Sequence, residues 1–206
     1  MSTEVLTWGP RDYVALPEIP DSWLVADVGP GAYPLKRANV LIDRDPKILE
    51  PLSAQGRKTI VCDINKGFVG IPDKSFDYVW ASHILEHLDD VTACAAALSR
   101  IAKSGTIVMP SAIKDGLFFF EEKAHQWHVL PNPLPLQPPI FVRHNRQFVY
   151  PLEDETCQSA MCFLFRTGSN HDCTAERNLR AWYQSHEQYL DIAYHWKDNL
   201  SLIVIG

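Results

Sequence analysis

This chain lacks the features that mark membrane, disulfide-rich and nucleic-acid-binding proteins. No run approaches the roughly 18 consecutive apolar residues that a membrane-spanning helix needs. The five cysteines are an odd number and include no Cys-x-x-Cys pair, so reduced thiols are expected. The formal net charge of −6 argues against a surface that binds phosphate backbones. We therefore expect neither a membrane nor a nucleic acid as partner.

Also missing are a leader-like N-terminus, an internal repeat and a linker. The first residues contain neither a basic segment nor a continuous apolar core, which predicts a cytoplasmic protein. With 46% hydrophobic and 21% charged residues, the composition is that of an ordinary globular protein. A length of 206 residues is enough for one full hydrophobic core, so we expect a single domain over residues 1–206.

What the chain does contain is an alternation of strand-like and helix-like segments. A helix is predicted over residues 90–103, because Asp90 suits its N-cap and Gly105 its stop. Strands alternating with crossovers imply a Rossmann-like, doubly wound, mostly parallel sheet in a three-layer α/β/α arrangement. The strand-like runs cover residues 25–28, 40–43, 60–63, 76–81 and 106–109.

After residue 110 the pattern changes. Clustered aromatic and histidine residues and the proline-rich run at 131–135 predict a lid or cap over residues 112–150. Proline-rich segments also bind aromatic grooves of partner domains, but inside a domain a rigid loop is favoured. Late strands are expected to complete the sheet in the antiparallel direction. The predicted late elements are strands at 139–143, 161–166 and 200–205 and an amphipathic helix at 175–194.

The first strand runs into a glycine turn. It ends as Asp27-Val28-Gly29-Pro30-Gly31, and glycine removes the Cβ that would hold a ligand away from the main chain. α/β proteins bind nucleotide-like molecules at such turns, although this one lacks the third glycine of the dinucleotide fingerprint. The turn alone therefore predicts only a nucleotide-like ligand.

Four further segments follow the turn in order. Asp43 ends the second strand, Asp63 follows the third, residues 71–80 read IPDKSFDYVW and residues 82–88 read SHILEHL. Together these segments resemble the class I S-adenosylmethionine-dependent methyltransferases, specifically the small methyltransferase-domain family of type 11. The resemblance covers about residues 24–111, the expected cofactor-binding core. It implies S-adenosyl-L-methionine as cofactor and S-adenosyl-L-homocysteine as product.

The resemblance also implies roles for single residues. Gly29 and Gly31 would pass under the methionine moiety, and Asp27 would lie near its ammonium group. Asp43 would accept hydrogen bonds from the ribose hydroxyls, because a carboxylate can accept two from a vicinal diol. Asp63 would receive the adenine amino group.

Two more residues complete the implied cofactor site, and the first crossover departs from the family pattern. Ile64 would form an apolar wall, and Ser82 follows the fourth strand, where ligands meet open α/β sheets. Asp45 is the alternative ribose acid. A simpler interpretation of Asp43 and Asp63 is that acids often end strands because turns favour them. Eleven residues separate Gly31 from Asp43, so the first crossover is shortened or irregular, and Tyr33 either packs on the cofactor or fills the missing turn.

Histidines are the candidate catalytic and substrate-binding residues. His83 is expected to contact the acceptor and to act as general base, because its unperturbed pKa lies near neutrality, and His87 follows one helical turn later. The structural alternative is that Glu86 and His87 only pin a short helix. The set His125, Trp127 and His128 either lines the acceptor pocket from the cap or forms a surface turn.

The sequence thus predicts methyl transfer to a small-molecule acceptor such as a sugar, a glycan precursor or another metabolite, with a homodimer left open. O-, N- and C-methylation are not distinguished. One alternative is a catalytically inactive S-adenosylmethionine-binding module that serves as a partner subunit. A less favoured alternative is a zinc peptidase of the His-x-x-Glu-His type, built on His83 and His87 with a third ligand from Glu153 or Glu155. The flanking sequence is not that of a peptidase, so no metal is predicted.

Overall fold

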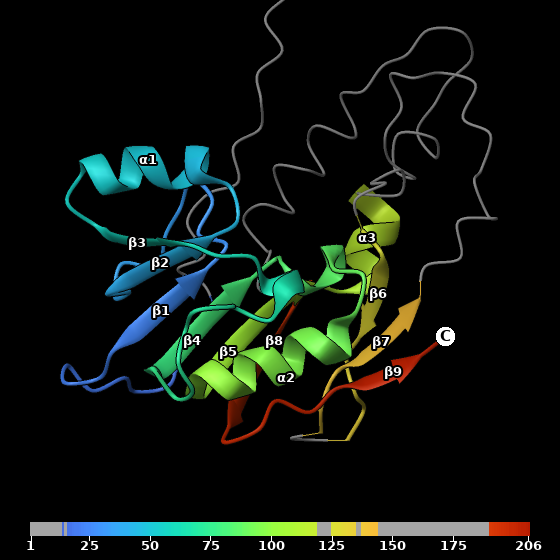
Figure 1. Ribbon diagram of the computed structural model, residues 1–206. Coiled ribbons are helices and arrows are strands. Elements are labelled where there is room, and N and C mark those ends of the chain that lie inside the picture. The colour runs from blue at the N-terminus through green and yellow to red at the C-terminus, as the bar shows by residue number, and fades with distance from the viewer. Residues whose placement is uncertain (1–13, 15, 119–124, 135–136, 144–189) are drawn as a thin grey trace, which may run out of the picture.

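The computed structural model describes Val14 and residues 16–118, 125–134, 137–143 and 190–206. Its main feature is a six-stranded sheet of order β3-β2-β1-β4-β5-β8, in which β1 to β5 are parallel and β8 is antiparallel to β5 (Figure 1). This arrangement confirms the expected Rossmann-like, mostly parallel sheet with a late antiparallel strand. The strands are β1 (Val25–Val28), β2 (Val40–Asp43), β3 (Lys58–Val61), β4 (Phe76–Ser82), β5 (Ala102–Pro110) and β8 (Asp191–Lys197).

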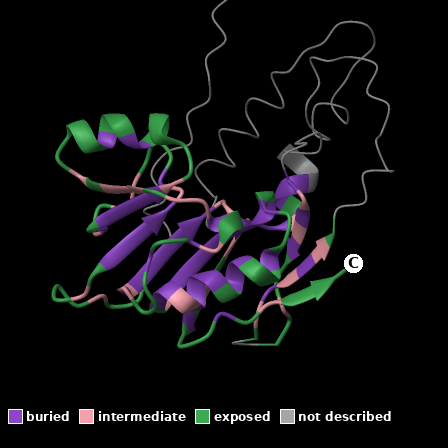
Figure 2. Cartoon of the chain, in the orientation of Figure 1, coloured by how far each residue is buried: buried purple, intermediate pink, exposed green. Residues whose placement is uncertain are grey.

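Helices cover both faces of this sheet. Alternate residues of a strand point to opposite faces, so Ala26 packs with helix α2 (Val91–Ile101), whereas Val25 packs with helix α1 (Pro46–Ala54). The central strands β1, β4 and β5 are almost entirely buried between these layers (Figure 2). The three-layer prediction is therefore confirmed. The remaining helical segments are η1 (Ile64–Lys66), η2 (Leu85–His87) and α3 (Ala112–Phe118).

Helix α2 begins where the sequence predicts and ends earlier. Asp90 is the N-cap, and its Oδ1 accepts a hydrogen bond of 2.9 Å from the amide of Ala93. The predicted helical extension to residue 103 is wrong, because Ala102 already pairs with Phe76 as the first residue of β5. Gly105 is a strand residue: a Cβ there would lie 2.5 Å from the carbonyl oxygen of Val79. Close strand packing, and not a helix stop, requires this glycine.

The first crossover contains no helix, which agrees with the expectation that it is shortened or irregular. Residues 29–39 link β1 to the parallel strand β2 through turns. Asp27 is buried, and its Oδ2 accepts a 2.7 Å hydrogen bond from the amide of Leu35, while Asn39 Oδ1 accepts one of 2.8 Å from the amide of Val25. Side-chain acceptors thus replace part of the backbone bonding that a helix would supply. Tyr33 is 39% exposed, so it does not fill a buried gap.

A second sheet of order β6-β7-β9 contains two strands of the predicted cap, whose described part also includes helix α3. Its strands are β6 (Trp127–Leu130), β7 (Ile140–Arg143) and β9 (Ile203–Ile205). Trp127, Val129 and Phe141 are buried in the main hydrophobic cluster, so this region contributes to the core. The other parts of 112–150, namely residues 119–124, 135–136 and 144–150, lie outside the described residues.

The late elements differ from the sequence prediction. Residues 191–194, predicted as the end of a helix, belong to strand β8, because pairing with β5 buries alternate side chains: Ile192, Tyr194 and Trp196 pack on the core. The final strand is shorter than predicted, and it pairs with β7 of the second sheet instead of joining the main sheet. The predicted strand at 161–166 and residues 175–189 of the predicted helix lie outside the described residues.

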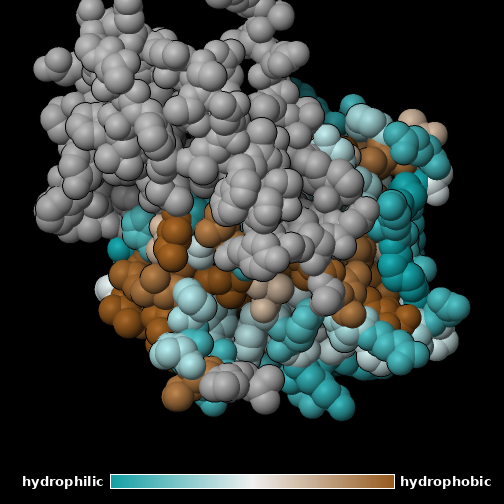
Figure 3. Space-filling model, turned by 180° about the vertical axis from the view of Figure 1, so that it is seen from behind, coloured by the Kyte–Doolittle hydropathy of each residue, from teal (hydrophilic) through white to brown (hydrophobic). Residues whose placement is uncertain are grey.

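Hydrophobic side chains also reach the surface. Figure 3 shows them, in brown, on the face behind that of Figure 1. The edge strand β9 exposes Ile203, Val204 and Ile205 by 37 to 54%. Among the described helices, none combines the length and apolar character that a membrane crossing needs.

The N-cap of α2 gives a stability prediction. Replacement Asp90→Ala removes the bond to the amide of Ala93 and should lower the free energy of unfolding by about 1 kcal/mol. The matched control is Asp89→Ala, which removes the same charge from an exposed neighbour that caps no helix. Urea unfolding of both variants checks this, and equal losses would contradict the capping role.

Candidate functional site

A cavity of about 230 Å³ lies at the carboxyl ends of the parallel strands. Ligands bind open α/β sheets at this edge. Four of the predicted site residues meet here: Gly29, Asp43, Ile64 and His87. The remaining lining residues are Val28, Ile42, Arg44, Ile48, Cys62, Asn65, Ile84 and Leu88.

Gly29 is required by both its backbone conformation and its surroundings. Its φ of 66° lies in the left-handed region, and a Cβ at this position would lie only 2.0 Å from Cδ1 of Ile84. Gly31 also has a positive φ of 54°, but no atom lies within 4 Å of its Cβ position. The glycine turn therefore brings bare backbone to the cavity at Gly29, whereas Gly31 serves the turn and is not part of the lining.

Each acid at a strand end uses one carboxylate oxygen to accept a hydrogen bond from a backbone amide of the following turn. Asp43 Oδ1 accepts a 2.9 Å hydrogen bond from the amide of Asp45, and Asp63 Oδ1 accepts one of 3.0 Å from the amide of Asn65. Asp45 caps helix α1 through the amide of Lys47. Asp43 and Asp63 thus make the turn hydrogen bonds expected of acids at strand ends. This bonding leaves the second carboxylate oxygen of Asp43 and Asp63 without a hydrogen bond to the described residues.

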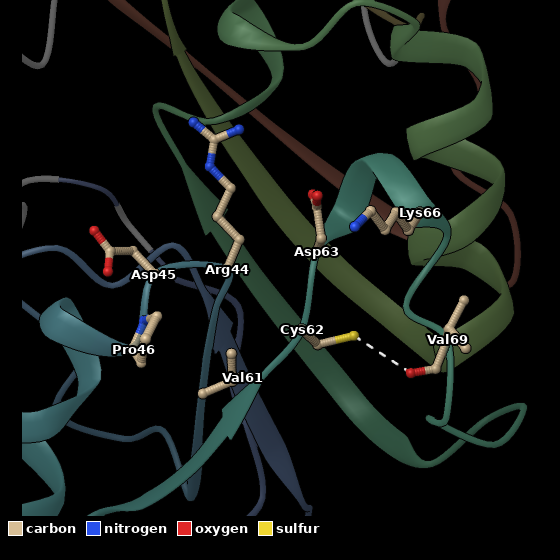
Figure 4. Close-up of a pocket in the computed structure, with 8 residues that line it drawn as sticks. All are labelled: Arg44, Asp45, Pro46, Val61, Cys62, Asp63, Lys66 and Val69. Atoms are coloured by element: carbon tan, nitrogen blue, oxygen red, sulfur yellow. Dashed lines mark hydrogen bonds between the residues drawn. The ribbon is translucent and has the colours of Figure 1, made fainter.

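A wider groove of about 580 Å³ continues the cavity along β3. The two spaces share Arg44 and Cys62 as lining residues. In Figure 4 the side chains of Arg44 and Asp63 extend toward the same side, with Lys66 beside Asp63, while the Cys62 thiol lies 3.6 Å from the carbonyl oxygen of Val69. Asp63 and the alternative acid Asp45 thus lie in the groove, and Asp43 lies in the cavity.

Besides Gly31, two predicted cofactor residues lie outside both spaces. Asp27 is 2% exposed and holds the first crossover through Leu35. Ser82 is 5% exposed, and its hydroxyl makes no hydrogen bond to the described residues. Sequence reasoning missed Arg44 and Cys62, although each directly adjoins one of the predicted acids.

His83 lies in a buried network of charged groups at the end of β4. Its φ of 54° turns the chain out of the strand, and its Nε2 lies 3.2 Å from Asp191 Oδ2. Lys114, whose side chain is fully buried, donates from Nζ to Asp191 Oδ1 at 2.6 Å. Burial alone would raise the pKa of Asp191, but His83 and Lys114 together lower it to about 2.

A second network surrounds Glu86. This carboxylate is fully buried, with Oε1 at 3.4 Å from His83 Nδ1 and 3.9 Å from His87 Nε2. Burial raises the pKa of Glu86, but His83 and the charges of His87 and His125 outweigh it and hold the pKa below its usual value. Nδ1 of His125 lies 2.8 Å from Asp115.

Asp115 binds this network to the second sheet. Burial would raise the pKa of Asp115, but the hydrogen bonds and charges of His125 and His128 lower it. Trp127 lies between these histidines in sequence, yet its ring is 6% exposed and its Nε1 donates to the carbonyl oxygen of Leu88 at 2.7 Å. Trp127 is therefore a core residue, and it belongs neither to a surface turn nor to the wall of a described pocket. Substrate binding by His125 and His128 stays a prediction.

Sequence reasoning missed Lys114, Asp115 and Asp191. No spacing rule links them to the histidines, because Lys114 and Asp191 are 77 residues apart and meet only in the folded chain. The geometry also separates the two histidines of the zinc-peptidase pattern. His83 lies outside helical segment η2 and pairs with Asp191, whereas His87 groups with Glu86 and His125.

Comparison with known proteins agrees with the sheet and the glycine turn. Residues 27–109 match the family model for a methyltransferase domain. This part of the chain is a methyltransferase domain. The match confirms the family resemblance seen over about residues 24–111. The domain extends from β1 to β5 and contains Gly29, Asp43, Asp63 and His83. No curated protein matches the chain.

Solved structures with similar folds share little sequence with the methyltransferase domain. The YcgJ protein of Bacillus subtilis is 19% identical over 46% of this chain and 47% of that chain, with a TM-score of 0.40. An S-adenosylmethionine-dependent methyltransferase of Mesorhizobium loti is 16% identical over 63% and 60%, with a TM-score of 0.42. One from Aquifex aeolicus is 18% identical over 44% and 57%, with a TM-score of 0.35. The chain covers less than two thirds of each of these structures.

The ionised Asp191 should contribute to stability in a defined pH range. Its pKa of about 2 in the folded protein lies below the value of about 3.9 expected when unfolded. The stabilisation is therefore complete above about pH 4 and is lost as the pH falls toward 2, and it amounts to about 2 kcal/mol. Urea unfolding of the wild type and Asp191→Asn between pH 5 and pH 2 should show the stability gap narrowing by this amount. A constant gap would contradict the assignment.

Proposed function

We propose that this protein is an S-adenosylmethionine-dependent methyltransferase that acts on a small-molecule acceptor. One observation supports this most strongly: the methyltransferase domain places bare backbone at Gly29 and a carboxylate at Asp43 in the same cavity, next to a histidine network. When bound, S-adenosylmethionine supplies a methyl group activated by its sulfonium. The cytoplasmic location and the homodimer remain predictions.

The residues of the cavity fit the parts of such a cofactor. Gly29 presents main chain to the cavity, where Ile84 fills the space that a Cβ would take, and the second oxygen of Asp43 is available to a ribose hydroxyl. Asp63, in the continuing groove, can accept a hydrogen bond from an adenine amino group, and buried Ile64 borders the cavity. The other end of the cavity reaches His87 in segment η2.

His83 is the proposed general base. Asp191 Oδ2 lies 3.2 Å from its Nε2, so this carboxylate orients the ring. A base is needed when the acceptor loses a proton during methyl transfer, and positioning supplies much of the remaining catalysis. Because the buried Lys114 also pairs with Asp191, the carboxylate stays ionised throughout the physiological pH range.

The ribose assignment is tested by binding of S-adenosylhomocysteine. Asp43→Ala should weaken binding roughly 10- to 100-fold, because a charge-assisted hydrogen bond in the cavity is lost. The control Asp45→Ala removes a carboxylate two residues away and weakens the cap of α1, but it should keep wild-type affinity. Isothermal titration calorimetry measures both. A wild type that does not bind the ligand overturns the cofactor assignment, and unchanged affinity in Asp43→Ala overturns the ribose role.

The base is tested by His83→Asn, since asparagine tolerates the positive φ at this position. Turnover of an acceptor that the wild type methylates should fall about 100-fold or more, while affinity for S-adenosylhomocysteine stays near wild type. Mass spectrometry of the methylated product gives the rate. Full turnover in this variant would remove His83 from the mechanism, and absence of any product from a broad acceptor panel would favour the inactive-module alternative.

A further inference from the structure

Three potential metal ligands from two separated segments converge beside the cavity. Glu86 and His87 belong to η2, and His125 precedes β6. One ligand atom from each lies within 4.8 Å of the others, and the two histidine rings meet edge to face with centroids 4.6 Å apart. A 2.6 Å backbone hydrogen bond from the amide of Gln126 to the carbonyl oxygen of Glu86 fixes the two segments against each other. The fold therefore holds this trio together.

The carboxylate of Glu86 is buried without a hydrogen-bond donor among the described residues. Its side chain is fully buried, and neither oxygen accepts a hydrogen bond from the described residues. A buried carboxylate without donors costs several kcal/mol, so such groups are normally paired or bound to a metal ion. The contacts of 3.4 Å and 3.9 Å to His83 and His87 are too loose to satisfy it.

His125 has the support that metal-binding histidines usually have. Its Nδ1 lies 2.8 Å from Oδ1 of the buried Asp115, which leaves Nε2 as the nitrogen for a metal. A carboxylate that holds one ring nitrogen fixes the orientation of the ring and makes the second nitrogen a better ligand. Asp115 thus holds His125 in place for metal binding.

We propose that Glu86, His87 and His125 form a site for a zinc ion. Two imidazoles and one carboxylate are a donor set that zinc prefers, and they leave the fourth tetrahedral position open. Calcium and magnesium favour oxygen ligands instead. Zinc ligands lie about 3.3 Å apart in tetrahedral geometry, so the three ligand atoms, which lie within 4.8 Å of one another, must approach by about 1.5 Å at most.

The zinc site adjoins the cofactor cavity, because His87 also lines that cavity. Its open position suits an oxygen, nitrogen or sulfur atom of the acceptor, and this part alone rests on the proposed function. The site is distinct from the His83 and Asp191 pair. It also differs from the His-x-x-Glu-His pattern, in which Glu86 would be a base and not a ligand.

The test is a calorimetric titration of the chelator-treated protein with zinc chloride. Elemental mass spectrometry then measures the zinc that the protein retains after dialysis. The wild type should retain one zinc ion per chain, and His87→Gln and His125→Gln should each weaken binding at least about 100-fold. Asp115→Asn should weaken it about 10- to 100-fold, because the support of His125 is lost. His87 is the exposed member of the trio, so its variant is expected to fold normally.

The matched control is His128→Gln, a neighbouring histidine whose Nδ1 lies 3.7 Å from the other oxygen of Asp115. It should bind zinc as the wild type does, with circular dichroism confirming the fold of every variant. A wild type that retains no zinc overturns the proposal, as does equal loss in His128→Gln and His125→Gln. No S-adenosylmethionine is present, so failure of the cofactor assignment would leave this result unchanged.

Discussion

The site depends on the burial of one carboxylate, Asp191, between His83 and Lys114. A buried charge is stable only with close partners, and here the partners come from the end of β4 and from α3. The topology explains how they meet. The parallel strands end at the cavity, and the antiparallel β8 begins there, so Asp191 pairs opposite Pro110 at the carboxyl end of β5. A residue from the last part of the chain thereby reaches the edge where the parallel strands end.

That arrangement divides the ligand edge into two chemical regions. Over β1 to β3, bare backbone at Gly29 and carboxylates at Asp43 and Asp63 suit an amino acid tail, a ribose and a base. Beyond β4, histidines held by buried acids suit proton transfer or metal binding. The reacting centre is expected where the regions meet, near His83 and η2. The carboxylates therefore have different tasks because their surroundings differ.

The sequence predicted what local pattern determines. The buried runs of β1 and β2, the cap at Asp90 and the irregular first crossover are as expected, because strand hydrophobicity, capping and chain length are local constraints. The sequence-based prediction was wrong where strand pairing determines the structure. Gly105 looked like a helix stop but lies against Val79 in β5, and residues 191–194 looked helical but pair with that strand. The partners of His83 and His125 were missed because tertiary contact alone unites them.

The most direct measurement of the central claim is a crystal structure of the complex with S-adenosylhomocysteine. The account predicts ribose hydroxyls within hydrogen-bonding distance of Asp43, the methionine chain over Gly29, and the sulfur facing His83 and η2. A ligand bound elsewhere, or one whose ribose points away from Asp43 while its sulfur lies far from His83, would contradict it.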